Sequence, residues 1–257
     1  MADGRVLSWN RPPDHSWHHG LWFSWKYING VNYWEPADRK AGTYAGRTLC
    51  SDVQTDTRPD GSARITLNIV YRNPQDVAVL NEARTMEISA PDATGGYQMD
   101  WTATFTAGTE DVTLDRTPLA TEKGGRAWGG YAGLSLRFAK DLADREAIST
   151  EGRATFVSDR ARPRSVAADY NGRLGDDDVG VAMIDHPDNP RHPTPWYLIR
   201  GTPMSYMNAA LLTYEPLVIP AGKSMTLRYR VIVHPERWEA ARLEAEHKRF
   251  AATGKET

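Results

Sequence analysis

The chain has 257 residues, of which 40% are hydrophobic and 25% charged, so it can bury a sizeable core. Its 31 basic and 33 acidic residues leave a net charge of -2, which does not favour nucleic acid or an anionic membrane as a partner. One cysteine, Cys50, excludes an intrachain disulfide. No apolar stretch is long enough to span a membrane, and the mean hydropathy of -0.58 is typical of a soluble chain. Because the first ten residues lack the apolar run of a signal peptide, we expect a cytoplasmic protein.

The aromatic composition is the unusual feature, with 9 Trp and 11 Tyr against 5 Phe. Trp and Tyr combine a large apolar ring with a polar group, and sugars present both C–H faces and hydroxyl rims. The composition therefore favours carbohydrate binding. A large β-sandwich that fills its core with Trp would give the same composition.

Apolar and polar residues alternate along several segments. Because successive side chains of a strand point to opposite faces, such alternation indicates strands with one buried face. The pattern predicts strands at Arg64–Tyr71, Gln98–Phe105 and Met225–Val233, with further candidates at Val77–Ile88 and Gly133–Phe138. Turn-forming Gly and Pro residues separate these runs. We therefore expect an all-β fold, a large antiparallel β-sandwich formed by residues 1–257 as a single domain.

One helix is predicted at about residues 235–252, a segment rich in Glu, Ala, Arg and Lys. Pro235 suits a first helical turn, and Lys248 and Arg249 suit a last turn. We expect this helix to be structural and to dock on the edge of the sandwich through Trp238.

The first candidate binding segment is DHSWHHGLWF, residues 14–23. It holds His15, His18 and His19 beside Trp22, and Lys26 follows shortly after. Imidazole titrates near neutral pH, so the cluster could contact a substrate, shuttle protons or bind a metal. An extended segment would place His15 and His19 on one face and His18 on the other. A surface cluster without a ligand is the simplest alternative.

The second candidate segment is DHPDNPRHPTPWY, residues 185–197, which carries His186, Arg191, His192 and Trp196. Its four prolines restrict the backbone, and a stiff loop with polar and aromatic groups suits a preorganised binding site. The alternative is a surface connection that the prolines merely order.

Two shorter segments add candidates for the same site. The glycine-rich stretch of residues 124–131 carries Arg126 and Trp128, and its glycines would let a ligand approach the backbone. Glu215 precedes the last predicted strand, where a carboxylate can act as a general base. A flexible hairpin and a solvated surface glutamate are the respective alternatives.

Together, these segments resemble the bacterial PmoA-like family, whose members carry the label "methane oxygenase". The matching stretches are DHSWHHGLWF, NGVNYW, WGGYAGLSLRF, GVAMIDHPDNPRHPTPWYLI and EPLVIPAGKSMTLRYRVIVH, which occur in this order over most of the chain. The label implies a metal-dependent oxygenase.

The pattern also resembles, more distantly, the aldose epimerases, or galactose mutarotases. An early His-Gly motif, a later histidine and a glutamate before a final strand occur in the same order here, as His19-Gly20, His186 or His192, and Glu215. This resemblance implies a supersandwich fold and a sugar bound in a cleft. It makes Glu215 the candidate base and His192 or His186 the candidate acid.

Three functions are therefore considered. The first is a carbohydrate-active enzyme (an epimerase, lyase or hydrolase) that needs no cofactor and has Glu215, His192 and His186 as catalytic residues. Its substrate-binding residues would be His15, His18, His19, Trp22, Lys26, Arg126, Trp128, Arg191 and Trp196. The second is a carbohydrate-binding protein without catalysis. The third is a metal-dependent oxygenase or hydrolase that uses His15, His18 and His19 as ligands.

Overall fold

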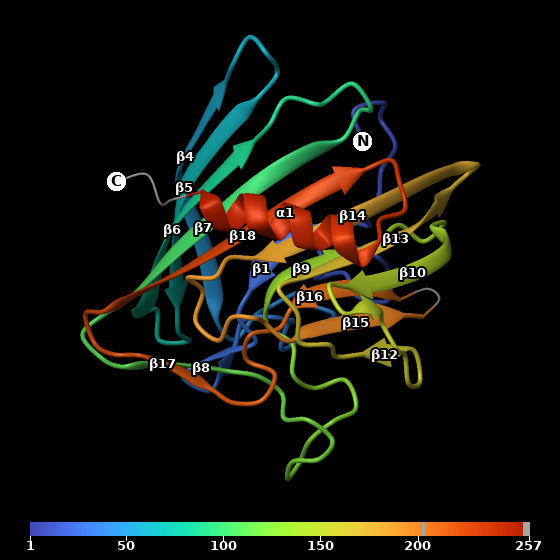
Figure 1. Cartoon of the computed structure of the whole chain (residues 1–257). Coiled ribbons are helices and arrows are strands. Elements are labelled where there is room, and N and C mark those ends of the chain that lie inside the picture. Colours follow the sequence, from blue (N-terminus) through green and yellow to red (C-terminus); the bar gives the residue numbers. More distant parts are fainter. Residues whose placement is uncertain (202–203, 254–257) are drawn as a thin grey trace.

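The computed structural model describes residues 1–201 and 204–253, which form antiparallel β-sheets and one helix (Figure 1). The largest sheet has nine strands: β4 (Arg47–Thr57), β5 (Ala63–Arg72), β6 (Ala78–Ile88), β7 (Tyr97–Ala107), β10 (Ala143–Ser149), β11 (Gly152–Arg153), β13 (Ala167–Leu174), β14 (Asp177–Asp185) and β18 (Ser224–His234). A five-stranded sheet contains β1 (Leu21–Ser24), β9 (Gly133–Arg137), β12 (Arg160–Ala161), β15 (Trp196–Arg200) and β16 (Ser205–Ala209). A small sheet contains β2 (Tyr27–Ile28), β3 (Val31–Asn32), β8 (Val112–Asp115) and β17 (Leu217–Ile219).

The strands confirm the predicted all-β class. Each of the five segments predicted from alternation coincides with one strand, β5, β6, β7, β9 or β18, to within two residues at either end. The order of the largest sheet is β11-β10-β13-β14-β18-β7-β6-β5-β4. Neighbouring strands in this order are antiparallel throughout, which matches the short connections and polar turns of the sequence.

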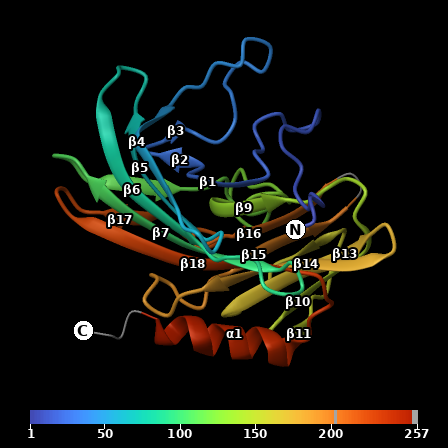
Figure 2. The same cartoon turned by 90° about the horizontal axis from the view of Figure 1, so that it is seen from above.

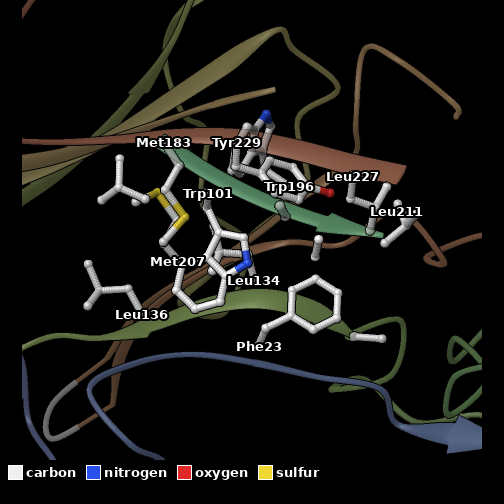
Figure 3. Packing of buried hydrophobic residues seen from close by; sticks show 14 of the residues in the cluster. Phe23, Trp101, Leu134, Leu136, Met183, Trp196, Met207, Leu211, Leu227 and Tyr229 are labelled. Atoms are coloured by element: carbon white, nitrogen blue, oxygen red, sulfur yellow. The ribbon is translucent and has the colours of Figure 1, made fainter. Parts of the chain in front are cut away.

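The main hydrophobic core lies between the nine-stranded and the five-stranded sheets (Figure 3). Trp101 of β7, Leu227 and Tyr229 of β18 and Met183 of β14 enter it from the larger sheet. The five-stranded sheet contributes Phe23, Leu134, Leu136, Trp196 and Met207 to this core. All of these side chains are buried, and burial of this apolar surface is the main force that holds the two sheets together.

The five-stranded sheet uses its two faces differently. Leu134 and Leu136 of β9 point into the core, whereas Ser135 and Arg137 point to the opposite face. The same alternation sends Trp196 of β15 into the core and Tyr197 to the other side, into a separate buried cluster. Trp196 was predicted to contact a substrate. Its ring is instead fully buried, and its Nε1 donates to the carbonyl of Ser165.

The predicted helix is present as α1 (Ala240–Ala252), and it begins about five residues further along the sequence than expected. Trp238 precedes it and stacks on His234, the last residue of β18, with ring centroids 3.9 Å apart. α1 lies across the outer face of the nine-stranded sheet, rather than at its edge (Figures 1 and 2). Leu243 and Phe250 of α1 bury their side chains against β10, β13 and β14. Neither α1 nor any other described segment is a helix long and apolar enough to cross a bilayer.

Truncating Leu243 tests this docking, because its side chain is fully buried beneath α1. Leu243→Ala removes buried methyl groups and leaves a cavity, so the free energy of unfolding should fall by about 2 to 5 kcal/mol. Urea denaturation followed by circular dichroism measures the change. Lys248→Ala, on the exposed side of the same helix, should stay within about 0.5 kcal/mol of the parent. Equal effects of the two substitutions would contradict the packing described here.

Candidate functional site

A cavity of about 480 Å³ lies against the face of the five-stranded sheet that is turned away from the core. Its floor comes from the sheet: Arg160 of β12, Tyr197 and Ile199 of β15, and Tyr206 of β16. Loop residues form the walls: His15, Trp17, His18, Trp34, Glu35, Arg39, Trp128, Tyr131 and Met204. Another cavity, of about 520 Å³, has Trp9 as the one aromatic among its described lining residues and no histidine there. The aromatic cavity is therefore the candidate site.

Strand register explains why residues far apart in the sequence share this floor. Arg137 of β9 pairs with Tyr206, Tyr206 pairs with Ile199, and Ile199 pairs with Arg160. Paired residues of neighbouring strands project to the same face of a sheet. This single row across four strands therefore carries three of the four floor residues. Tyr206 is fixed further by a hydrogen bond of 2.9 Å between its hydroxyl and that of Ser135.

The first wall segment folds into consecutive turns and is not extended. The N–H of His15 donates to the carbonyl of Pro12 (3.0 Å), and the N–H of His18 donates to that of His15 (2.9 Å). These turns bring the rings of His15 and His18 into a stack with centroids 4.8 Å apart. The adjacent His19 is exposed, and its backbone pairs with Asn10 instead. The segment is therefore not extended, and His15 lies against His18, which an extended segment would have placed on the opposite face.

His15 is oriented by a chain of charged groups. Its Nδ1 lies 2.8 Å from Oδ2 of Asp14, and that carboxylate accepts hydrogen bonds of 2.9 and 3.1 Å from the fully buried guanidinium of Arg137. Partial burial acts to raise the pKa of Asp14, but the hydrogen bonds from Arg137 and His15 outweigh it and lower the pKa overall. An ionised carboxylate can only accept hydrogen bonds, so Nδ1 of His15 carries a proton. In the neutral ring, Nε2 then has a free lone pair.

His18 is a buried neutral ring. It stacks on Trp22 of β1, with centroids 4.6 Å apart, and burial is the main cause that lowers its pKa to about 3. Its Nδ1 is buried and has no hydrogen-bond partner among the described residues. His18 lines the cavity without a charge at neutral pH, and it supports the ring of His15 from behind.

The second wall segment follows β3 and is shaped by a side chain. Oδ1 of Asn32 accepts hydrogen bonds from the backbone N–H groups of Trp34 (2.8 Å) and Glu35 (3.4 Å), which turns the chain at this point. Both residues then face the cavity. The carboxylate of Glu35 forms an ion pair with the ammonium of Lys26, whose side chain is only 1% exposed. Burial lowers the pKa of Lys26, although this ion pair opposes the shift.

The third wall segment is a compact loop of residues 117–130. A side chain at Gly129 would collide with the carbonyl of Pro118, at 2.1 Å, so the close approach of the two ends of the loop requires glycine. Arg162 holds the loop through hydrogen bonds to the carbonyls of Ala127 and Gly129. The loop presents Trp128, which is 44% exposed, to the cavity.

Several residues predicted from sequence meet at this cavity. His15, His18 and Trp128 line it. Trp22 and Lys26 lie in the layer behind the lining, in contact with His18 and Glu35 respectively. Aromatic and charged groups of two separate predicted segments are therefore brought together.

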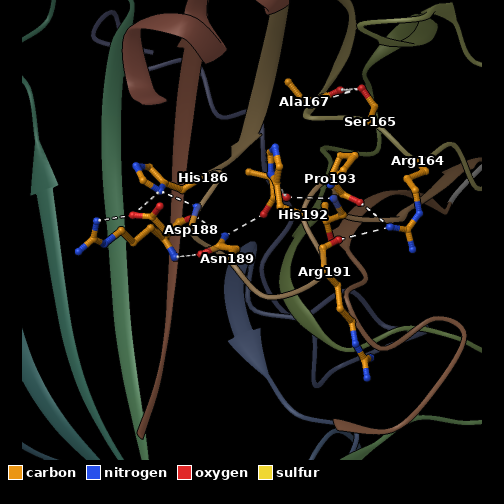
Figure 4. A network of polar contacts seen from close by, with 12 residues as sticks. Arg164, Ser165, Ala167, His186, Asp188, Asn189, Arg191, His192 and Pro193 are labelled. Atoms are coloured by element: carbon orange, nitrogen blue, oxygen red, sulfur yellow. Dashed lines mark hydrogen bonds and ion pairs between the residues drawn. The ribbon is translucent and has the colours of Figure 1, made fainter. Parts of the chain in front are cut away.

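His186 and His192 lie elsewhere, in a polar network that supports α1 (Figure 4). Nε2 of His186 is 3.3 Å from the carbonyl of Thr253, just beyond α1, and its ring edge contacts Phe250. His192 bonds to Asp185 through Nδ1 (2.8 Å) and stacks on His247 of α1. Neither histidine is among the residues that line the cavity. These contacts show that the proline-rich loop, which follows β14, packs against α1.

Arg191 and Glu215 also belong to that loop region. The guanidinium of Arg191 donates to the carbonyls of Leu211, Glu215 and Pro216, and so fastens two loops together. The side chain of Glu215 is 71% exposed, and its nearest charged partner is Arg191 at 3.5 Å. The expected meeting of Glu215 with the early histidines at one face is not observed.

Neither Arg126 nor the three early histidines form the contacts expected from sequence. Arg126 is exposed and donates to carbonyls of its own loop, at Gly124 and Gly125, and it is not among the residues that line the cavity. Within residues 1–201 and 204–253, no three His, Cys, Asp or Glu side chains are placed to hold a metal ion. His15, His18 and His19 therefore do not form a ligand set.

Most of the residues that line the cavity were not predicted from the sequence. Trp17 and Trp34 lie in motifs that were recognised, and Tyr131 and Tyr197 are near neighbours of residues that were chosen. Strand alternation at β15 could have indicated that Tyr197 and Trp196 face opposite sides. Nothing in the local pattern distinguishes Glu35, Arg39 or Arg160 from ordinary surface charges.

The acid sensitivity of the fold tests the state of His18. In the unfolded chain this histidine binds a proton below pH 6.5, whereas in the folded protein it stays neutral down to about pH 3. Stability should therefore be lost as the pH falls through this range. His18→Phe removes this contribution. The unfolding free energy of the variant should therefore fall less steeply with decreasing pH than that of the parent, and the two slopes should differ by up to about 1.4 kcal/mol per pH unit. Urea denaturation at pH 6.5, 5.5 and 4.5 measures this, and parallel curves would refute it.

Three solved structures show remote similarity to the chain. The Slr1438 protein from Synechocystis sp. PCC 6803 has a TM-score of 0.43 at 8% identity, over 72% of this chain and 66% of that one. A putative aldose 1-epimerase from Klebsiella pneumoniae subsp. pneumoniae MGH 78578 has a TM-score of 0.43 at 7% identity, over 79% of this chain and 59% of that one. The polysaccharide lyase BACCELL_00875 has a TM-score of 0.29 at 15% identity, over 75% of this chain and 26% of that one. The chain thus covers less than two thirds of the length of each.

Comparison of sequences gives the family. No curated protein matches the chain. None of these comparisons names a PmoA-like protein, so they give no support to that resemblance. A family model described as a family of unknown function, DUF6807, matches residues 1–248. Since this match covers nearly the whole chain, the protein belongs to the DUF6807 family.

Proposed function

We propose that this protein binds a sugar or sugar derivative in the aromatic cavity and catalyses proton transfer on it, as an epimerase, lyase or hydrolase does. The observation that carries the proposal is a histidine oriented by a partly exposed carboxylate that is itself paired with a buried arginine, at the wall of a pocket lined by aromatic rings. The acid–base group is His15, in place of the pair of Glu215 with His192 or His186 expected from sequence.

The aromatic lining supports sugar binding. Three tryptophans and three tyrosines line the cavity: Trp17, Trp34, Trp128, Tyr131, Tyr197 and Tyr206. Their rings offer flat apolar surfaces for the C–H faces of a pyranose, and charged side chains among them offer partners for hydroxyl groups. A volume of about 480 Å³ lies within the range of small-molecule sites.

His15 has the features of a general base. Asp14 fixes the proton on Nδ1, which leaves Nε2 as the proton acceptor, and Arg137 holds Asp14 in place. This is the arrangement in which a carboxylate orients an imidazole and stabilises the cation formed when it takes a proton. Asp14 and Arg137 are thus positioning residues, and His15 is the proposed catalytic residue.

Glu35 and Lys26 supply a second group that can exchange a proton. Glu35 lines the cavity, and the Lys26 ammonium lies directly behind it. Because burial lowers the pKa of Lys26, its proton is given up more readily than that of a solvated lysine. We propose that this pair returns a proton to the substrate, through Glu35, after His15 has removed one.

The oxygenase implied by the PmoA-like resemblance is not proposed. Such an enzyme needs several ligands converging on a metal, and His15, His18 and His19 do not converge. Elsewhere in the described ranges no alternative group of ligands takes their place.

Sugar binding is tested first, with a panel of monosaccharides and short oligosaccharides in saturation-transfer NMR and isothermal titration calorimetry. Trp128→Ala should weaken the best ligand by about 2- to 10-fold, since it removes one partly exposed stacking surface. Tyr214→Ala, which removes an exposed ring outside the cavity, is the matched control. A panel in which no sugar binds would refute the proposal.

Catalysis is tested with the sugar that binds best. His15→Gln should reduce turnover by about 100- to 10,000-fold with little change in binding, because it removes the proton acceptor and keeps the shape. Asp14→Asn should reduce turnover as well, because it releases the orientation of His15. Glu215→Gln, which alters an exposed carboxylate outside the cavity, should retain turnover. The reverse outcome, with Glu215→Gln inactive and His15→Gln active, would return the site to the location expected from sequence.

A further inference from the structure

The charges around the cavity do not balance. Glu35 is the one carboxylate that lines it, and its charge is matched by Lys26. Asp14, behind the lining, is matched by Arg137. Arg39 and Arg160 also line the cavity, and neither forms an ion pair with any described residue. Among the residues that the structure describes, the site therefore presents two guanidinium groups that have no carboxylate partner.

Arg160 is held as a fixed donor. Its Nε donates to the hydroxyl of Tyr197 (3.1 Å) and its Nη1 to the carbonyl of Ser158 (3.1 Å). No residue within 1–201 or 204–253 accepts a hydrogen bond from Nη2. The two bonds keep the plane of the guanidinium in one orientation, so the remaining donor is available to a ligand without loss of side-chain freedom.

Arg39 is positioned by stacking on an aromatic ring, whereas Arg160 is positioned by hydrogen bonds. It is exposed, and its guanidinium lies over the ring of Trp17, 4.7 Å from the centroid. Stacking uses the face of the guanidinium and leaves its N–H edges free to bind an anion. Arg39 thus adds a second positive charge to the wall, on the segment that also carries Trp34 and Glu35.

We infer that the ligand of this cavity is a sugar acid, whose carboxylate is bound by Arg160 and Arg39 while its ring packs against the aromatic walls. The inference rests on the proposed sugar-binding function and narrows its substrate class. A carboxylate is planar and matches the fork of donors on a guanidinium, and hydrogen bonds between ionised partners are the strong ones. A neutral sugar would leave both charges without a counterion in a partly closed site.

A sugar phosphate is the competing anion, and the site suits it less well. Phosphate sites commonly use the N-terminus of a helix or a nest of backbone N–H groups. The helix of the described chain, α1, packs on the outer face of the nine-stranded sheet through β10, β13 and β14, and contributes nothing to the cavity lining. The anion-binding groups here are side-chain guanidiniums alone, which favours the carboxylate.

Calorimetric titrations compare glucuronate and galacturonate with glucose, galactose and glucose 6-phosphate. The parent protein should bind one of the hexuronates at least about 10-fold more tightly than the neutral sugar of the same configuration. Arg160→Gln should remove about 10- to 100-fold of the hexuronate affinity and change the affinity for the neutral sugar by less than about 3-fold. Arg39→Gln, at an exposed position, should act in the same direction with a smaller loss.

Lys40→Gln is the matched control, because it removes one positive charge next to Arg39 from a residue outside the lining. It should leave hexuronate binding unchanged. Equal affinity for acidic and neutral sugars would overturn the inference and leave the proposed function intact, and so would tighter binding of glucose 6-phosphate. Failure of every sugar to bind would overturn both.

Discussion

The interaction on which the site depends is the contact between Arg137 and Asp14. Arg137 is fully buried on the outer face of the five-stranded sheet, and a buried charge is costly unless an opposite charge and hydrogen bonds accompany it. Asp14 supplies both, from a loop more than a hundred residues away in sequence. This one pair therefore fastens the histidine-bearing loop to the sheet and also orients His15.

The five-stranded sheet serves the fold with one face and the proposed function with the other. Alternation places Trp196, Leu134 and Leu136 in the core, and Tyr197 and Arg137 on the cavity side. The core side is rigid because it is closely packed against the nine-stranded sheet. Side chains on the cavity face project from the same strands, so their backbone positions are fixed by the packing of the core. A preorganised binding site requires such fixed positions.

The sequence predicted the strands because their alternation is local information, and it identified His15, His18 and Trp128 because clustered histidines and glycine-flanked tryptophans are uncommon. It could not predict which histidines meet, because two turns in residues 12–19 replace the extended geometry. Glu35, Arg39 and Arg160 reach the cavity only through loop folding and cross-strand register, which no local pattern records. The chemistry of imidazole made His186 and His192 candidates, but both histidines contact α1 or the residue that follows it, and they hold the proline-rich loop against the helix.

The location of the ligand is the most direct test of this account. A crystal structure of the protein soaked with the best-binding sugar should show ligand density between Trp34, Trp128 and His15, with an oxygen atom within hydrogen-bonding distance of Nε2 of His15. Density beside Glu215 and His192, with the aromatic cavity filled only by solvent, would contradict it.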